Sequence, residues 1–181
     1  MIRKIVIIHG WKDNPNGGWL GWFASQLRHE GYEVVNPQMP RDTIPDIDNW
    51  VDIVNNVVGE LDHYTILIGH SLGTFVLLRY LERYEGIEKA LALVLVAGFL
   101  NPKIDKANDY FLPTPDVEKV KKHVESIYHI YSDDDKMVST DRSIELADKL
   151  GGEQICLEGK GHFTAKEISE LPELLDIIKN I

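Results

Sequence analysis

Five residues near the middle of the chain have the types and spacing of a catalytic serine motif. Gly69-His70-Ser71-Leu72-Gly73 follows the pattern G-x-S-x-G and lies between a strongly apolar segment and an amphipathic one. In this motif a sharp strand-to-helix turn exposes the serine hydroxyl, and the flanking glycines avoid steric collisions. The alternative is a glycine-rich helix start at which Ser71 only accepts a backbone hydrogen bond. We expect Ser71 to be a nucleophile that attacks a carbonyl carbon.

A serine hydroxyl is a weak nucleophile at neutral pH, so it needs a general base. Gly161-His162-Phe163 lies in a predicted loop between the last strand and the final helix. Nucleophile-elbow enzymes have the chain order serine, acid, histidine, which places the base at this connection. An isolated loop histidine is more often an ordinary surface residue, but the position of His162 favours the role of base.

The third group should be a carboxylate that orients the histidine, and it should follow the penultimate strand. The segment Ser132-Asp133-Asp134-Asp135-Lys136 contains three such carboxylates in a row. Only one is needed, and burying three adjacent charges would be unfavourable. The other two are therefore interpreted as parts of a solvated acidic turn.

An oxyanion hole should accompany the nucleophile, with one backbone N–H from the residue after the serine and one from an early loop. Here these donors would be the amides of Leu72 and of Trp11, in the loop that begins His9-Gly10. No metal site is expected, because the spacing of the remaining histidines fits no ligand signature. The histidines considered for a metal are His9, His63, His70, His123 and His129.

Short β-branched runs alternate with longer amphipathic stretches, which is typical of βαβ units around a parallel sheet. The predicted strands are Lys4–Ile8, Glu33–Val35, Tyr64–Ile68, Ala92–Val96, Ser126–Tyr131 and Glu153–Leu157. The predicted helices are Trp19–Glu30, Ile47–Leu61, Leu72–Tyr84, Thr140–Leu150 and Glu167–Asn180. After Ser71, the apolar residues Phe75, Leu78 and Leu81 recur at helical spacing and should pack on the sheet.

The segment from Gly98 to Glu125 interrupts the pattern with three prolines and is too short to be a separate domain or a large lid. At most it forms a small flap with a helical stretch around Val117–His123. Aromatic side chains are candidates for contacts with an acyl group, although core packing is the better interpretation for any one of them. These candidates are Trp19, Trp22, Phe99, Tyr110, Phe111 and Phe163.

The composition indicates one globular domain over residues 1–181. The chain has 29 acidic residues against 19 Lys and Arg, and it has no basic cluster, so nucleic acid and anionic membranes are poor partners. No apolar run reaches the length of a membrane span, and the run in residues 1–8 is too short for a signal peptide. The single cysteine, Cys156, is expected at a buried strand position, and one thiol fits a reducing cytoplasm.

The chain resembles the small serine hydrolases grouped with retinoblastoma-binding protein 9 and its bacterial relatives. The resemblance extends over the whole length and is based on several short motifs. These are His9-Gly10, Trp19-Leu20-Gly21-Trp22, Met39-Pro40, Gly69-His70-Ser71, Leu93-Val94-Leu95-Val96-Ala97, Asp134-Asp135 and Gly161-His162-Phe163.

The resemblance implies a minimal α/β-hydrolase: a three-layer α/β/α sandwich with a six-stranded, mainly parallel sheet in the order 2-1-3-4-5-6 and no large lid. It also implies no cofactor and a triad of Ser71, Asp135 and His162. Asp135 matches the family spacing D-x-x-V, in which Val138 returns to the core. The expected activity is hydrolysis of small-molecule acyl esters.

The chain departs from the family in one respect that concerns partners. The L-x-C-x-E pattern associated with the family's name is absent, because Gln154 stands two residues before the single cysteine. Binding to a retinoblastoma-type pocket protein is therefore unsupported.

Two other functions stay open at this point. A catalytically idle hydrolase fold that serves as a protein- or ligand-binding module would keep the same core and an unreactive Ser71. A nucleotide-binding domain would need a glycine-rich phosphate loop, and the first loop, residues 10–18, has neither G-x-G-x-x-G nor a Walker pattern.

Overall fold

Six strands form a single sheet in the computed structural model, which describes residues 2–42, 44–101 and 113–181. The strand order is β2-β1-β3-β4-β5-β6, and each neighbouring pair is parallel. The strands are β1 (Lys4–Ile8), β2 (Glu33–Val35), β3 (Thr65–His70), β4 (Ala90–Val96), β5 (Val124–Ser132) and β6 (Glu153–Leu157). The predicted sheet and its strand order are confirmed.

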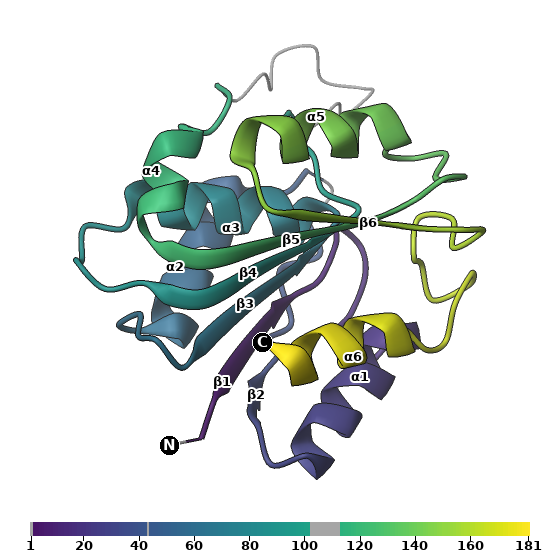
Figure 1. Ribbon diagram of the computed structural model, residues 1–181, viewed down its shortest axis with the longest axis horizontal. Helices are drawn as coiled ribbons and strands as arrows, with labels where there is room; N and C mark the ends of the chain where they lie inside the picture. Colours follow the sequence, from purple (N-terminus) through teal and green to yellow (C-terminus); the bar gives the residue numbers. More distant parts are fainter. Residues whose placement is uncertain (1, 43, 102–112) are drawn as a thin grey trace.

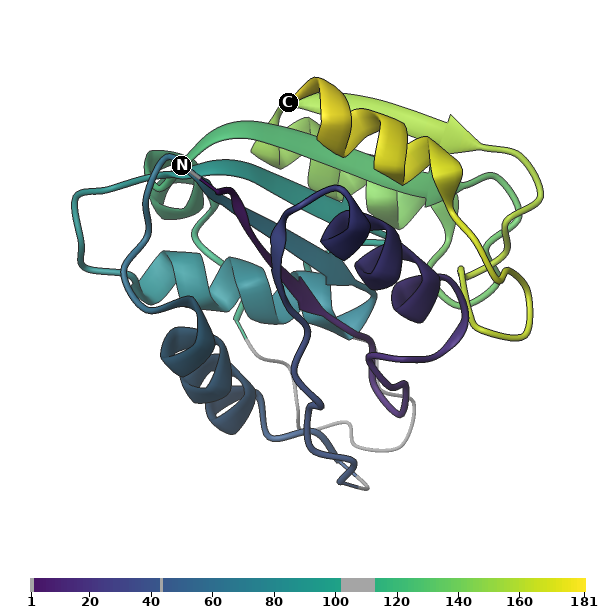
Figure 2. The same ribbon diagram turned by 90° about the horizontal axis from the view of Figure 1, so that it is seen from below.

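Helices cover both faces of this sheet and complete the expected three-layer sandwich (Figures 1 and 2). One face carries α1 (Gly18–His29) and α6 (Pro172–Asn180), which lie next to each other. The other face carries α2 (Ile47–Val58), α3 (Leu72–Arg83), α4 (Val117–Lys122) and α5 (Thr140–Leu150). The fold is therefore that of a minimal α/β-hydrolase.

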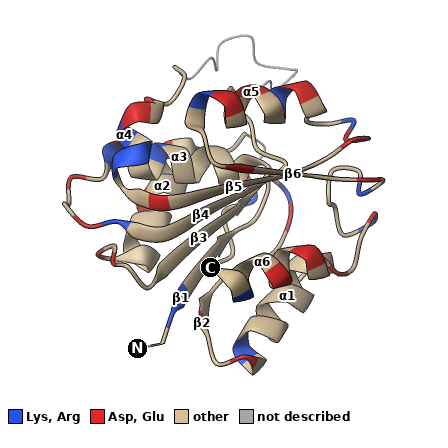
Figure 3. Ribbon diagram, in the orientation of Figure 1, with Lys and Arg blue, Asp and Glu red and all other residues tan. Residues whose placement is uncertain are grey.

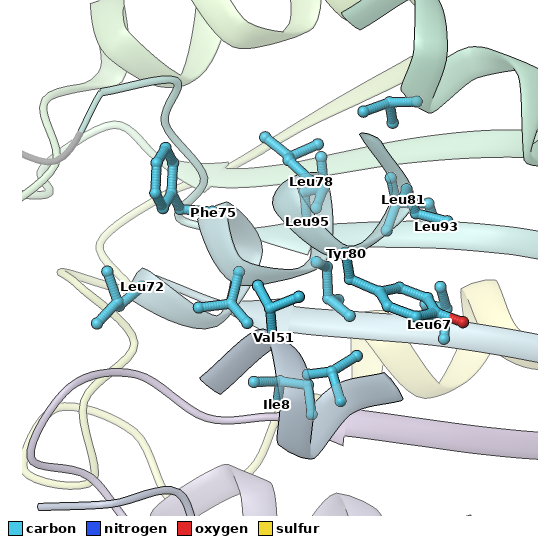
Figure 4. Close-up of a cluster of buried hydrophobic side chains, with 14 of the residues drawn as sticks. Ile8, Val51, Leu67, Leu72, Phe75, Leu78, Tyr80, Leu81, Leu93 and Leu95 are labelled. Carbon is cyan, nitrogen blue, oxygen red and sulfur yellow. The ribbon is translucent and has the colours of Figure 1, made fainter. Parts of the chain in front are cut away.

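The central strands β3 and β4 are buried along their whole length, because helices shield them from both sides. Both strands lack charged residues, whereas the helices and loops around them carry many (Figure 3). Figure 4 shows α3 packed on this layer, with Phe75, Leu78 and Leu81 directed into the same apolar cluster as Leu93 and Leu95. The predicted packing face of α3 is confirmed, and each fully buried side chain of this size contributes about 1.5–3 kcal/mol.

Two predicted helix boundaries differ from the structure by more than one residue, for local reasons. The second helix ends at Val58 instead of Leu61, because Gly59 adopts a left-handed conformation with φ of 67°. The last helix begins at Pro172 instead of Glu167, and proline is favoured in the first turn because it lacks the N–H that would be unpaired there.

Because the strands are parallel, the loops that follow them all begin at the same edge of the sheet, where the carboxyl ends of the strands lie. Neighbouring strands are paired up to their ends: Ile8 with Gly69, His70 with Val96, Val96 with Ile130 and Ser132 with Leu157. The ends of β1, β3, β4, β5 and β6 therefore lie side by side. The segments that begin at His9, Ser71, Asp133 and Glu158 therefore start from the same edge. Among the described residues no large lid covers it, as expected.

Cys156 does not have the predicted buried position. It lies on β6, which is the edge strand of the sheet, and its side chain is exposed. The error arises because β6 is covered less completely than the central strands. Each helix of the described residues is too short or too polar to cross a membrane.

Three buried histidines should make the stability of the fold depend on pH. Burial lowers the pKa values of His9, His70 and His129, and that of His70 falls to about 4. Between pH 6.5 and these lowered values the unfolded chain binds protons that the folded chain excludes. The free energy of unfolding should therefore decrease as the pH falls below about 6.5, by at most ~1.4 kcal/mol per pH unit for each histidine.

The His129→Gln variant isolates one of these sites, because glutamine can still donate to the Gly151 carbonyl that His129 Nε2 contacts at 2.8 Å. Thermal melting between pH 7.5 and 4.5 should show a shallower loss of Tm than in the unmodified chain. The matched control is His29→Gln, since His29 is exposed. Equal slopes for the two variants would contradict the assignment.

Candidate active site

Ser71 occupies a sharp turn between β3 and α3 with a backbone conformation that is rare for a non-glycine residue. Its φ and ψ are 52° and −119°. A Cβ on Gly69 would lie 2.7 Å from the Thr74 backbone, and one on Gly73 would lie 2.1 Å from the Ile8 carbonyl oxygen. Both glycines of the motif are therefore needed for close backbone packing, as the sequence pattern predicts.

The structure brings Ser71, His162 and Asp135 together from three separate connections. His162 Nε2 lies 2.8 Å from Ser71 Oγ, and His162 Nδ1 lies 2.7 Å from Asp135 Oδ2. His162 and Asp135 are both buried, with exposures of 4% and 8%. In this geometry the carboxylate accepts from Nδ1–H and leaves Nε2 free to accept the serine proton.

Asp135 is the residue of the acidic run that contacts the histidine. Its other oxygen, Oδ1, accepts hydrogen bonds from the amides of Met137 at 2.8 Å and Val138 at 2.9 Å. Val138 is buried, so the chain does return to the core three residues after the aspartate. These bonds fix the carboxylate in the orientation that its contact with His162 requires.

Asp133 and Asp134 are exposed, but they do more than form a solvated turn. Asp133 Oδ1 accepts from the Gly159 amide at 2.9 Å, and Asp134 Oδ1 accepts from the Gly161 amide at 2.8 Å. A hydrogen bond from Ser132 and the one from Gly161 lower the pKa of the Asp134 carboxyl. The two carboxylates thus connect the β5 loop to the loop that carries His162, a contact that the sequence interpretation missed.

Three side chains from other parts of the chain hold the His162 loop. Trp19 Nε1 donates to the Phe163 carbonyl at 2.8 Å, and His70 Nε2 donates to the His162 carbonyl at 2.9 Å. Glu167 Oε2 accepts from the His162 amide at 3.0 Å. No local motif indicates these roles, because the two carbonyl contacts join residues 144 and 92 positions apart.

The histidines considered for a metal site have other partners in the described structure. Met39 N–H donates to His9 Nε2 at 3.0 Å, and His63 Nδ1 lies 2.7 Å from a Glu125 carboxylate oxygen. His70 and His129 both donate to backbone carbonyls. His123 lies 5.1 Å from the Tyr84 ring in an edge-on contact.

A cavity of about 460 Å³ opens beside Ser71, and both residues expected to supply oxyanion donors, Trp11 and Leu72, line it. Of the aromatic candidates, Phe99 also lines the cavity. Trp19 and Phe163 are instead fully buried in the core cluster on the α1 and α6 side of the sheet, and the partly buried Trp22 packs against this cluster. Tyr110 and Phe111 lie outside the described residues.

Comparison with known proteins gives matches over nearly the whole chain. Residues 5–180 match the family described as serine hydrolase. YdeN of Bacillus subtilis is 27% identical over 98% of this chain and 95% of its own length. Serine hydrolase RBBP9 of Rattus norvegicus is 28% identical with the same two coverages. The crystal structure of the ydeN gene product superposes with a TM-score of 0.91 at 25% identity, and covers 98% of this chain and 97% of that one.

The elbow geometry predicts an unusual response to an alanine substitution. Replacing a helical glycine by alanine normally stabilises a helix by up to about 1 kcal/mol. Gly73→Ala should instead lower the free energy of unfolding by about 1–3 kcal/mol, because the new Cβ would overlap the Ile8 carbonyl oxygen. Denaturant unfolding of the purified variant measures this change.

Gly31→Ala provides a contrast to that substitution, because Gly31 has a left-handed backbone conformation and open space around it, whereas Gly73 lies within α3 and is tightly packed. Gly31 has a φ of 87° but no heavy atom within 4 Å of an added Cβ, so it reports the backbone penalty alone. A Gly73→Ala variant as stable as the unmodified chain would show that the turn does not need this close approach.

Proposed function

We propose that this chain, which belongs to the serine hydrolase family, cleaves small carboxylic esters through an acyl-enzyme formed on Ser71. The observation that carries the proposal is the continuous hydrogen-bonded series Ser71, His162 and Asp135, with distances of 2.8 and 2.7 Å, at the wall of the cavity. A serine hydroxyl in contact with a buried, oriented imidazole is the arrangement that activates it for attack on a carbonyl.

In the first half of the reaction, Ser71 Oγ attacks the ester carbonyl while His162 Nε2 takes its proton. The resulting imidazolium is stabilised by Asp135, and His162 then returns the proton to the departing alkoxide. The products of this half-reaction are the alcohol and an ester bond between the acyl group and Ser71. A water molecule, deprotonated by the same imidazole, hydrolyses that bond and releases the acid.

The oxyanion that forms in each half-reaction needs hydrogen-bond donors at a fixed place. We assign this role to the backbone amides of Trp11 and Leu72, because both residues line the cavity beside Ser71. Gly10 supports this placement, since a Cβ there would lie 3.1 Å from the Ser71 Cβ. The loop after β1 therefore lies close to the nucleophile, which supports the assignment.

The cavity supports substrates of modest size. Its volume of about 460 Å³ lies within the usual range for small-molecule sites, ~300–1,000 Å³. Its apolar wall includes Phe99, Met137 and Val138, which suit the aliphatic part of an acyl group. The site thus fits the cleavage of a small, water-soluble ester that carries one aliphatic acyl chain.

Labelling with a fluorophosphonate probe tests the nucleophile. The unmodified chain should form one covalent adduct, which mass spectrometry of the digest should place on Ser71, because ordinary serines do not attack such probes. Ser71→Ala should abolish the adduct, while Ser139→Ala should retain it, since Ser139 makes no side-chain hydrogen bond at the start of α5. A folded, unlabelled chain would favour the catalytically idle binding module instead.

The second test concerns the acid. Asp135→Asn should lower kcat for 4-nitrophenyl butyrate by about 10³–10⁴-fold, because an amide at that position favours the wrong imidazole tautomer. Asp134→Asn and Asp133→Asn should lower it by less than about tenfold, since both positions are exposed and their side-chain oxygens can still accept from the loop amides.

Thermal melting of the three variants separates lost chemistry from lost fold. If kcat fell strongly in Asp134→Asn and stayed nearly unchanged in Asp135→Asn, the acid of the triad would be Asp134 and not Asp135.

A further inference from the structure

Positive charge is concentrated at the cavity beside Ser71, although the whole chain has a formal net charge of −10. Three cationic side chains line the cavity: Lys12 after β1, Arg142 in the first turn of α5, and Lys166 after the His162 loop. Asp13 is the acidic residue that lines it in the described structure. The cavity lining thus has the opposite sign of charge to the molecule as a whole.

Two neighbours hold the guanidinium of Arg142 in the cavity wall. The Cζ atom lies 5.0 Å from the centre of the Phe99 ring, and one terminal nitrogen donates to the Asn101 carbonyl. Phe99 is itself buried and stacks on Phe75 at 6.2 Å. The guanidinium therefore lies in the cavity wall against a buried, well-packed aromatic ring.

Among the described residues, Arg142 uses little of its capacity to donate hydrogen bonds. A guanidinium has five N–H groups, and the described residues provide one acceptor, the Asn101 carbonyl. No carboxylate oxygen of the described residues lies within 4.0 Å of it. Burial lowers the pKa of Arg142, while the charges of Glu145 and Asp135 raise it. A partly buried arginine that forms no ion pair with the described part of the chain is suited to binding an anion.

We propose that the cavity selects esters that carry an anionic group, a carboxylate or a phosphate, and that Arg142 binds this group while Ser71 reacts with the ester. This proposal rests on the proposed esterase function and names its substrate class. Phe99, Met137 and Val138 then contact the aliphatic part of the substrate. Lys12 and Lys166, both exposed, contribute long-range attraction to the same charge.

Matched ester pairs test the proposal. In one pair the acyl group carries the charge: 4-nitrophenyl hydrogen adipate against its neutral methyl ester. In the other the alcohol carries it: 4-(butyryloxy)benzoate against its methyl ester. In at least one pair kcat/KM should favour the anion by about 10–100-fold, the range expected for a charge-assisted bidentate contact. Preference for the neutral ester in both pairs would overturn the proposal.

Substitution of Arg142 assigns the preference to a residue. Arg142→Gln should reduce the ratio of anionic to neutral kcat/KM to near one, and Arg142→Lys should restore part of it, because lysine keeps the charge but loses the bidentate geometry. Lys89→Gln is the control, since Lys89 is exposed just before β4, at the opposite end of the strand from the site. An unchanged ratio in Arg142→Gln would overturn the assignment.

Ionic strength provides a measurement that needs no variant. Between 10 and 300 mM salt, kcat/KM of the unmodified chain should fall for the preferred anionic ester and stay level for its neutral partner, because salt screens the attraction. A salt-independent ratio would count against the proposal even if Arg142→Gln failed to fold. Failure of the esterase function itself is distinguishable, since neutral esters would then not be cleaved and the fluorophosphonate would not label Ser71.

Discussion

The close approach of the β3–α3 turn to the end of β1 constrains everything else at this edge of the sheet. Gly73 packs against the Ile8 carbonyl, where a side chain has no room, and Gly10 lies against Ser71, where the space is tight. The left-handed conformation of Ser71 persists because its amide donates to Val96 O at 2.9 Å, while its carbonyl accepts from Thr74 N and Oγ1. Such a conformation stores about 1–3 kcal/mol, which the surrounding packing must offset.

The position of His162 depends on contacts between residues that are far apart in the sequence but adjacent in the fold. Trp19 on α1 and His70 at the end of β3 each satisfy a carbonyl of the loop that would otherwise be buried without a donor. Burial keeps His70 neutral near pH 7, and the nearby His162 lowers its pKa further. A neutral His70 matters for the proposed mechanism, because a second cation beneath His162 would oppose the imidazolium that forms there.

Much of this fold could be predicted from the sequence, because the parallel sheet has continuous apolar strands and the elbow has a local signature. The connections that carry Ser71, the acidic run and His162 were also predictable, since their places follow from strand order, whereas the choice of Asp135 within that run came from the family resemblance. The supports of the His162 loop were not, because Trp19, His70 and Glu167 resemble ordinary core or surface residues until the chain is folded. Cys156 was placed wrongly for a related reason: a short apolar run does not reveal whether its strand lies at the edge of the sheet.

The net charge of the chain affects large and small ligands differently. An acidic surface without a basic cluster disfavours a polyanion such as nucleic acid, because many phosphates would face the surface at once. A small anion in the cavity experiences a different field, since charges farther away than about 8 Å are screened at physiological salt. Within that distance, side chains such as Lys12 and Arg142 dominate. The charge of a preferred substrate therefore follows from the few residues that line the site, and the sign of the whole molecule is a poor guide to it.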